Sequence, residues 1–174
     1  EKCFHFANAI TVTVKQTFND FRKIHGTKYD DKLHISRFAT EGIDCIKKLE
    51  ETVSRKECRE SYGIPENKIC VTVGYSAYRE QHQDTILEKI GELPQNIREK
   101  LFVIVPMQYG RLEDKEYLDR VEKIKNSVDF DCVILREYVP FEMSARLAVA
   151  TDVYLHLRDT DAFSNALKEH VFAG

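Results

Sequence analysis

Leu101-Phe102-Val103-Ile104-Val105 is the stretch that decides the fold of this chain. Five apolar residues in a row, without alternation, are typical of a strand buried on both faces of a parallel sheet. Similar runs lie on either side of it, at 69–73, 132–135 and 153–157. Helical patterns separate these runs, at 83–93, 113–127 and 140–149. Strands that alternate with helices predict an α/β fold with a Rossmann-like, doubly wound parallel sheet.

The first half of the chain extends this alternation upstream. Residues 10–14 are rich in β-branched side chains and predict a strand, and apolar residues at helical spacing follow until His25-Gly26. Residues 33–38 alternate and predict a short strand, whereas 41–52 fit either a helix or a crossing linker. Ser54 and Glu57 have the spacing of a capping box, which predicts a helix beginning there.

Composition excludes several classes of protein. The 174 residues carry a net charge of −3, so no bulk electrostatic attraction to nucleic acid is expected. The five cysteines are odd in number and show no C-x-x-C spacing, which favours reduced thiols in the cytoplasm. No stretch reaches the length of a membrane span, and no signal peptide is recognised. Because the chain begins with Glu1 and stops at Gly174 after a helical pattern, we expect a fragment of a longer protein.

Ligands of such sheets bind at the carboxyl ends of the strands. The loops to inspect are therefore 74–82, 106–113, 136–140 and 158–165. In the last of these, Ser164 and Asn165 stand where a helix begins, and the free amides and helix dipole there suit a diphosphate. Glu169 lies about one turn further on and could bind a ribose diol through its two oxygens. The alternative is that Ser164 only caps the helix and Glu169 is solvated.

Two other loops offer weaker candidates. Gly74 ends a strand and would let a phosphate approach the backbone, with Ser76 donating a hydrogen bond and Arg79 supplying charge. A plain strand-to-helix turn explains that glycine equally well. In the loop after residue 135, the backbone at Val139 could read the edge of a nucleobase while Tyr138 stacks nearby; a simple loop with a half-buried tyrosine is the alternative.

The histidines do not form a metal-binding pattern, and we expect neither a metal ion nor a cofactor. Of these residues, His82 in the Gly74 loop is the better candidate for a role at a site, whereas the position of His156 in a strand is typical of a core histidine. No Ser-His-Asp triad or carboxylate pair can be argued from the sequence, so catalytic residues stay unassigned.

The segment from Thr151 to Gly174 resembles the donor-site segment of glycosyltransferase group 1 enzymes, which have the two-domain GT-B fold. That family has an acidic residue, seven others and then a glutamate, which Asp161 and Glu169 match, with Phe163 at the aromatic position between them. Ser164 stands where the family commonly has glycine. The resemblance implies that Glu169 binds the ribose of a nucleotide sugar and that the preceding loop holds the sugar and diphosphate.

The rest of the chain is similar to the family in the same order. Residues 1–40 resemble the end of the N-terminal domain and the crossing segment, and 41–174 the nucleotide-sugar-binding domain, truncated at its C-terminus. The Gly74 loop departs from the family, because Tyr75 and Glu80 occupy positions of an arginine and a lysine that bind phosphate. Arg79 is the candidate substitute.

A second resemblance is carried by 73–76 and 102–110, which look like the 4-acetamido-4,6-dideoxygalactose transferases of enterobacterial common antigen synthesis. The two families differ in stereochemistry, so retention or inversion stays unassigned. Together they imply a bacterial hexosyltransferase of surface polysaccharide synthesis, inactive without its N-terminal domain, that uses a nucleotide-diphosphate sugar and a glycan or lipid-linked acceptor. They leave open a peripheral association of the full-length protein with the inner face of the membrane. The alternatives are a nucleotide-binding module without transfer activity and a sugar-nucleotide epimerase of GT-B architecture.

Overall fold

A computed structural model describes residues 2–36, 40–158 and 164–174. These residues form two compact units with a boundary between Thr40 and Glu41. The first unit contains residues 2–36, and the second contains residues 41–158 and 165–174. Three of the candidate ligand loops, 74–82, 106–113 and 136–140, belong to the second unit.

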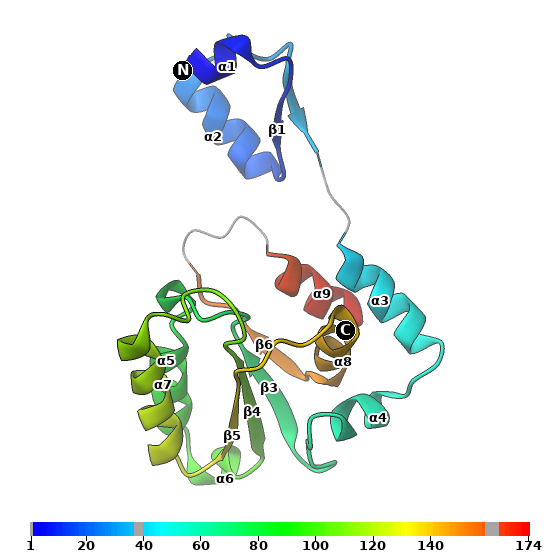
Figure 1. The fold of residues 1–174 in the computed structure, drawn as a ribbon, viewed down its shortest axis with the longest axis vertical. Helices are drawn as coiled ribbons and strands as arrows, with labels where there is room; N and C mark the ends of the chain where they lie inside the picture. The colour runs from blue at the N-terminus through cyan, green and yellow to red at the C-terminus, as the bar shows by residue number, and fades with distance from the viewer. Residues whose placement is uncertain (1, 37–39, 159–163) are drawn as a thin grey trace. The chain divides into compact units, whose positions relative to one another are not determined.

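The first unit is a short parallel strand pair with two helices (Figure 1). Its elements are α1 (Lys2–Phe6), β1 (Ile10–Val12), α2 (Lys15–His25) and β2 (Leu33–Ile35). The unit has an aromatic centre, in which the ring of Phe4 lies 5.1 Å from Phe21 and 6.0 Å from the buried Tyr29. Both predicted strands exist, although β1 ends at Val12, two residues earlier than the sequence pattern indicated.

The second unit contains a four-stranded parallel sheet with the order β5-β4-β3-β6. Its strands are β3 (Ile69–Val73), β4 (Leu101–Pro106), β5 (Asp131–Leu135) and β6 (Val153–Leu155). Every residue of β4 is buried, as its continuous apolar run predicts. The prediction of a parallel sheet built from these four segments is confirmed.

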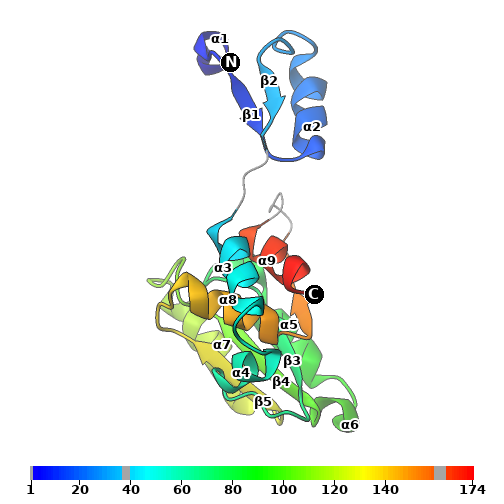
Figure 2. The ribbon, with the colours of Figure 1, turned by 90° about the vertical axis from the view of Figure 1, so that its right-hand side faces the viewer.

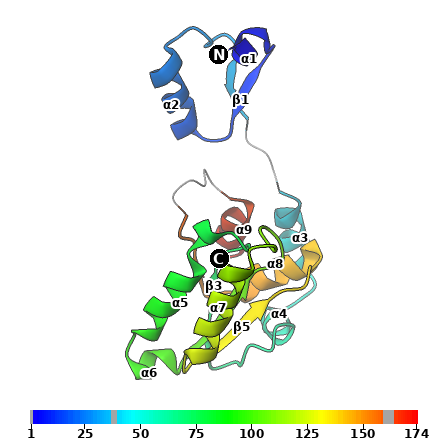
Figure 3. The ribbon, with the colours of Figure 1, turned by 60° about the vertical axis from the view of Figure 1, so that its left-hand side comes forward.

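Helices cover both faces of this sheet, so it is doubly wound. One face carries α5 (Gln83–Gly91) and α7 (Lys115–Ser127), which come forward in Figure 3. The other face carries α3 (Glu41–Glu50), α4 (Arg55–Glu60), α8 (Phe141–Ala150) and α9 (Asn165–Ala173), seen in front in Figure 2. Alternate residues of β4 serve the two cores: Val103 and Val105 pack toward α5 and α7, and Phe102 and Ile104 toward α3 and α8.

Local signals account for most of the element boundaries. Ser54 and Glu57 form the capping box that the sequence predicts, and α4 begins directly after Ser54. The ambiguous segment after residue 40 is the helix α3, which buries Ile46 and Leu49. A single turn of 3-10 helix, η1 (Arg79–Gln81), and the short α6 (Gln95–Arg98) were not predicted, and neither was α1. Each of these three elements has five residues or fewer, too few for a helical period to show in a sequence.

Candidate functional site

The strand order places a topological switch point between β3 and β6. The chain runs from β3 to β4 to β5 in one direction across the sheet and then places β6 on the other side of β3. Loops that leave neighbouring strands in opposite directions open a crevice at their carboxyl ends, which is where ligands bind in open α/β sheets. The Gly74 loop and residues 156–158 follow the two strands at this switch point.

Residues after β6 contact the Gly74 loop directly. The rings of Tyr75 and His156 stack, with centroids 5.7 Å apart and planes 9° from parallel. Arg158 donates a hydrogen bond of 2.7 Å from Nη1 to the hydroxyl of Tyr75, and its guanidinium lies 5.7 Å from the ring centroid of Tyr78. The backbone amide of Gly74 donates to the carbonyl of Leu155, so the strand pairing continues into the loop.

A buried glutamine fixes the other side of the Gly74 loop. Gln83 donates from Nε2 to the carbonyl oxygens of Ser76 and Pro106, at 2.9 and 3.2 Å, and so ties the loops after β3 and β4 together. The hydroxyl of Tyr117 donates to Gln83 Oε1 and accepts from the Gln83 amide, both at 3.1 Å. Burial raises the pKa of Tyr117 to about 12, so this hydroxyl stays protonated.

Gly74 has a backbone conformation that other residues seldom adopt. Its φ is +67°, and a Cβ added there would lie 3.0 Å from Gln81 Oε1 and 3.1 Å from Gln83 Nε2. Both glutamines are fully buried. The glycine at the end of the strand is therefore explained by the close approach of two side-chain amides as well as by its φ.

We expect Gly74→Ala to lower the free energy of unfolding by about 2 kcal/mol, of which the left-handed backbone accounts for about 1 kcal/mol and the contact with the two amides for the rest. Gly63→Ala is the matched control, because Gly63 has φ +65° but no atom within 4 Å of an added Cβ. Urea denaturation measures both variants. Equal losses in the two variants would contradict the packing role of Gly74.

Arg79, the predicted substitute cation, is held by two carboxylates. Its side chain donates to both oxygens of Asp114, from Nη2 at 2.7 Å, and to Glu116 at 2.9 Å. The hydrogen bond from Arg79 lowers the pKa of Asp114, which also caps α7 by accepting from the Tyr117 amide. Contact between Arg79 and a phosphate stays a prediction, and it would require Arg79 to leave Asp114.

Glu169 lies on α9 against the first turn of α3. A Cβ added at Gly42, the second residue of α3, would lie 2.1 Å from Glu169 Oε1, so a larger residue there would require the carboxylate to move. A carboxylate beside the N-terminus of a helix is stabilised by the helix dipole. The sequence did not single out Gly42, although a glycine inside a helical pattern is the signal that could have drawn attention to it.

For the remaining predicted residues within the described ranges, the structure gives a position in the fold. Ser164 is buried and directly precedes α9, at whose first position Asn165 stands. Tyr138 and Val139 follow β5, which β4 separates from β3, and the side chain of Tyr138 is 78% exposed. The two other predicted residues, Asp161 and Phe163, lie outside the residues that the structure describes.

Comparison with solved structures identifies the architecture. The chain is similar to the crystal structure of WaaG, a glycosyltransferase involved in lipopolysaccharide biosynthesis, with a TM-score of 0.68 and 20% sequence identity. The similarity covers 94% of this chain and 41% of WaaG. The chain has the Rossmann-like fold of a GT-B half. No protein-family model and no curated protein matches the sequence.

The chain therefore spans about two fifths of the length of the GT-B enzyme that it matches. At 20% identity the similarity establishes the fold. Among the described residues, no three His, Cys, Asp or Glu side chains are grouped so that they could hold a metal ion. In the same part of the chain, no helix has the length and apolar character that crossing a membrane requires.

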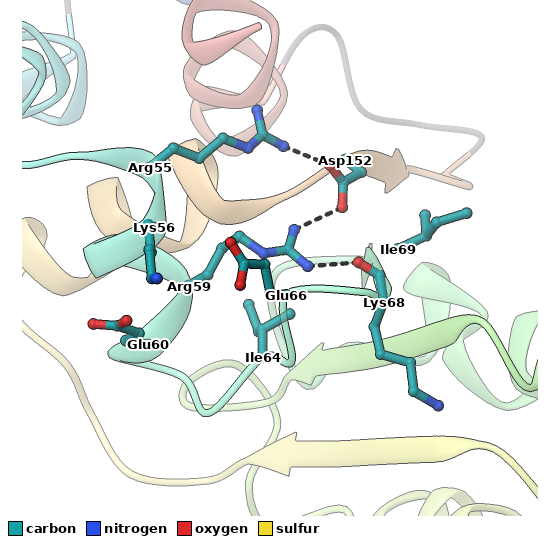
Figure 4. A pocket seen from close by; sticks show the side chains of 9 residues that line it. All are labelled: Arg55, Lys56, Arg59, Glu60, Ile64, Glu66, Lys68, Ile69 and Asp152. Atoms are coloured by element: carbon teal, nitrogen blue, oxygen red, sulfur yellow. Dashed lines mark hydrogen bonds and ion pairs between the residues drawn. The ribbon is translucent and has the colours of Figure 1, made fainter.

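The GT-B half also contains a hollow of about 730 Å³ at the opposite, amino end of the sheet (Figure 4). Asp152 organises it: this carboxylate accepts from the Cys70 amide at 2.7 Å and pairs with Arg59 at 2.9 Å and Arg55 at 2.6 Å. Arg59 further donates to the carbonyl of Lys68. These contacts join β3, α4 and the start of β6, so the hollow contains a structural ion-pair cluster that lies away from the switch point.

The structure places three histidines of the GT-B half, and one of them, His156, differs from its predicted role as a core residue. His156 was interpreted as a core residue, but it stands two residues from Tyr154 beyond the end of β6 and stacks on Tyr75 at the switch point. His82 joins η1 to α5 with a left-handed backbone, φ +50°, and its side chain caps neither helix. His170 stacks on Tyr154 at 3.9 Å, and burial lowers its pKa to about 4, so it is neutral at pH 7.

Proposed function

We propose that the chain is the nucleotide-sugar-binding half of a glycosyltransferase. The observation that carries this proposal is the switch point between β3 and β6, where a glycine turn, stacked rings and an arginine meet at the carboxyl ends of parallel strands. A diphosphate and its sugar suit such a crevice, because backbone amides and side-chain donors can stabilise the charge that develops on the departing phosphate. The similarity in fold to WaaG, a glycosyltransferase, supports the same function.

In this proposal each of the predicted residues binds one part of the nucleotide-sugar donor. The amides at Ser164 and Asn165, together with Gly74 and Ser76, hold the diphosphate, and Glu169 binds the ribose. The backbone at Val139 reads the base with Tyr138 beside it, Arg79 adds charge, and Asp161 and Phe163 complete the sugar end. Residues 1–40 belong to the N-terminal domain, which supplies the acceptor site and the catalytic residues, so the chain alone has no turnover.

The acceptor is proposed to be a glycan or lipid-linked sugar of surface polysaccharide synthesis, with the full-length protein in the cytoplasm at the inner face of the membrane. The involvement of WaaG in lipopolysaccharide biosynthesis supports this choice of pathway.

Binding and product analysis test the function. The full-length protein is titrated with a panel of nucleotide-diphosphate sugars, and the products formed with and without acceptor glycans are analysed by mass spectrometry. Transfer of the sugar to an acceptor is the expected result. Release of an epimerised sugar nucleotide would identify an epimerase, and binding without any product would identify a nucleotide-binding module. A protein that binds no nucleotide would contradict the proposal.

A further inference from the structure

Two residues of the Gly74 loop carry buried polar atoms that the protein leaves unpaired. In the part of the chain that the structure describes, Ser76 Oγ and both amide atoms of Gln81 lack a hydrogen-bond partner. Both residues are fully buried. Buried polar groups in native proteins are almost always paired, because an unpaired one destabilises the fold. Such groups at the carboxyl end of a strand, where ligands of α/β sheets bind, indicate that a ligand supplies the missing partners.

A second glutamine of this region shows how the fold satisfies such a side chain when its role is structural. Gln83 is fully buried as well. Its Nε2 donates to the carbonyls of Ser76 and Pro106, and its Oε1 accepts from the hydroxyl of Tyr117. Two residues earlier in the chain, Gln81 has the same side chain and the same burial but none of these bonds. The carboxamide of Gln81 is therefore not part of the network that holds the loop.

The unpaired carboxamide lies at the end of β3. A Cβ added at Gly74 would lie 3.0 Å from Gln81 Oε1 and 3.1 Å from Gln83 Nε2. Gln83 Nε2 also contacts the carbonyl of Ser76, at 2.9 Å. The two residues with unpaired atoms, Ser76 and Gln81, thus meet around Gly74 and Gln83, beside the place where the proposed function puts the diphosphate.

The chemistry of the unpaired atoms distinguishes between the parts of a nucleotide-sugar donor. A carboxamide has two N–H donors and an acceptor oxygen, and a serine hydroxyl can donate. Ionised phosphate oxygens only accept, so a phosphate suits Ser76 but leaves Gln81 Oε1 unpaired. Sugar hydroxyls donate as well as accept, so neighbouring hydroxyls of a hexose satisfy both amide atoms of Gln81. The hexose is bonded directly to the diphosphate, which puts it within the same site.

We propose that Gln81 binds hydroxyl groups of the donor's hexose and so helps to select the sugar, while Ser76 donates to the adjoining phosphate. The assignment rests on the proposed function. It adds a sugar-binding residue from the loop after β3 to those that the acidic motif places before α9.

The sugar reaches Gln81 only when the segment between Gly74 and His82 opens, because Gln81 lies beneath the surface. Apart from glycines, His82 is the one described residue with a positive φ, +50°. This left-handed backbone is unfavourable for a histidine, so it favours opening, as does the unpaired amide of Gln81. The pair between Arg79 and Asp114 holds the segment closed. Binding of the sugar adds the hydrogen bonds that shift this balance.

The test compares Gln81→Met with the wild type in the full-length protein. The probes are uridine, guanosine and thymidine diphosphates and the matching nucleotide sugars UDP-glucose, UDP-N-acetylglucosamine, GDP-mannose and TDP-glucose, all titrated by calorimetry. We expect Gln81→Met to weaken binding of the nucleotide sugar roughly tenfold and to leave binding of the diphosphate unchanged, because only the sugar contacts the carboxamide. A residue that only shapes the loop would change both affinities together.

Thermal denaturation provides the second measurement, with Gln83→Met as the matched control. Methionine replaces the unpaired amide of Gln81 by an apolar side chain of similar size, so Tm should rise by about 2–4 °C. The same substitution at Gln83 leaves the Tyr117 hydroxyl and two buried carbonyls without their partner, so Tm should fall.

Three results would overturn the assignment. A lowered Tm in Gln81→Met would show that the amide is paired in the free protein. Wild-type affinity for every nucleotide sugar in this variant would show that the hexose does not contact Gln81. Equal weakening of diphosphates and nucleotide sugars would restrict Gln81 to shaping the loop. In each of these cases a wild-type protein that binds the probes leaves the proposed function standing, whereas a wild-type protein that binds none of them contradicts the proposed function itself.

Discussion

Replacing Asp152 by alanine lowers the free energy of unfolding by about 3 kcal/mol, the largest loss of stability that we expect from a single substitution outside the hydrophobic cores. The reason is the position of Arg59, whose side chain is 11% exposed. Without the carboxylate, its guanidinium stays buried and the Cys70 amide loses its acceptor. Thermal denaturation followed by circular dichroism should show a fall in Tm of roughly 6–12 °C.

Glu92→Ala is the control for this experiment. Glu92 pairs with Lys89 three residues away, and both side chains are about two thirds exposed, at 64% and 67%. Exposed pairs of this kind contribute little, so the Tm of the control should hardly change. Similar losses in Asp152→Ala and Glu92→Ala would mean that the cluster at the amino end of the sheet does not stabilise the fold.

The same carboxylate gives the fold a dependence on pH. Burial by itself would raise the pKa of Asp152, but the Cys70 amide and Arg59 outweigh burial and hold the pKa below its ordinary value of 3.8. The unfolded chain therefore takes up this proton at a higher pH than the folded chain, and stability falls with acidification. We expect the stability difference between wild type and Asp152→Asn to be complete above about pH 5 and to shrink as the pH falls through the folded pKa. Denaturant titrations across this range measure it, and a difference that grew toward acid pH would contradict the assignment.

Features that depend on residues close together in the sequence could be predicted from the sequence. The five apolar residues of β4 specify a strand buried on both faces because each face of a covered parallel sheet needs apolar side chains. The capping box at Ser54 involves residues three positions apart, so the spacing alone reveals it. The α/β class, the parallel sheet and its four strands follow from signals of this local kind.

Features that depend on strand order could not be predicted. Nothing in the pattern of β6 indicates that it pairs with β3, and this pairing brings Arg158 to Tyr75 and His156 onto the same ring. The partner of Arg79 lies 35 positions away in the loop after β4, so the sequence showed a loop arginine but not its ion pair. A sequence shows which residues are charged or aromatic. Which residues form ion pairs or ring contacts with them depends on which strands are neighbours in the sheet.

Glu169→Gln should weaken nucleotide binding roughly ten- to hundredfold in the full-length protein if its carboxylate binds the ribose diol, because a charge-assisted hydrogen bond contributes about 1.5–3 kcal/mol. The structure supplies a concrete alternative. Glu169 Oε1 lies where a Cβ of Gly42 would be, beside the first turn of α3. A carboxylate that only complements this helix end stabilises the fold by about 0.3–1 kcal/mol and has no effect on nucleotide affinity.

Gly42→Ala separates the two roles because it moves the carboxylate without removing it. Alanine is favoured over glycine inside a helix, by about 1 kcal/mol, so the substitution should be harmless apart from its contact with Glu169. An added Cβ 2.1 Å from Glu169 Oε1 forces the side chain away from α3. We expect weaker nucleotide binding in both variants, measured by calorimetry, with Glu142→Gln on the neighbouring α8 as the control for loss of a carboxylate that is 66% exposed. A folded Glu169→Gln protein with wild-type nucleotide affinity and a lowered Tm would show that Glu169 only stabilises the N-terminus of α3. That result would mean that Glu169 does not bind the ribose in the proposed donor site.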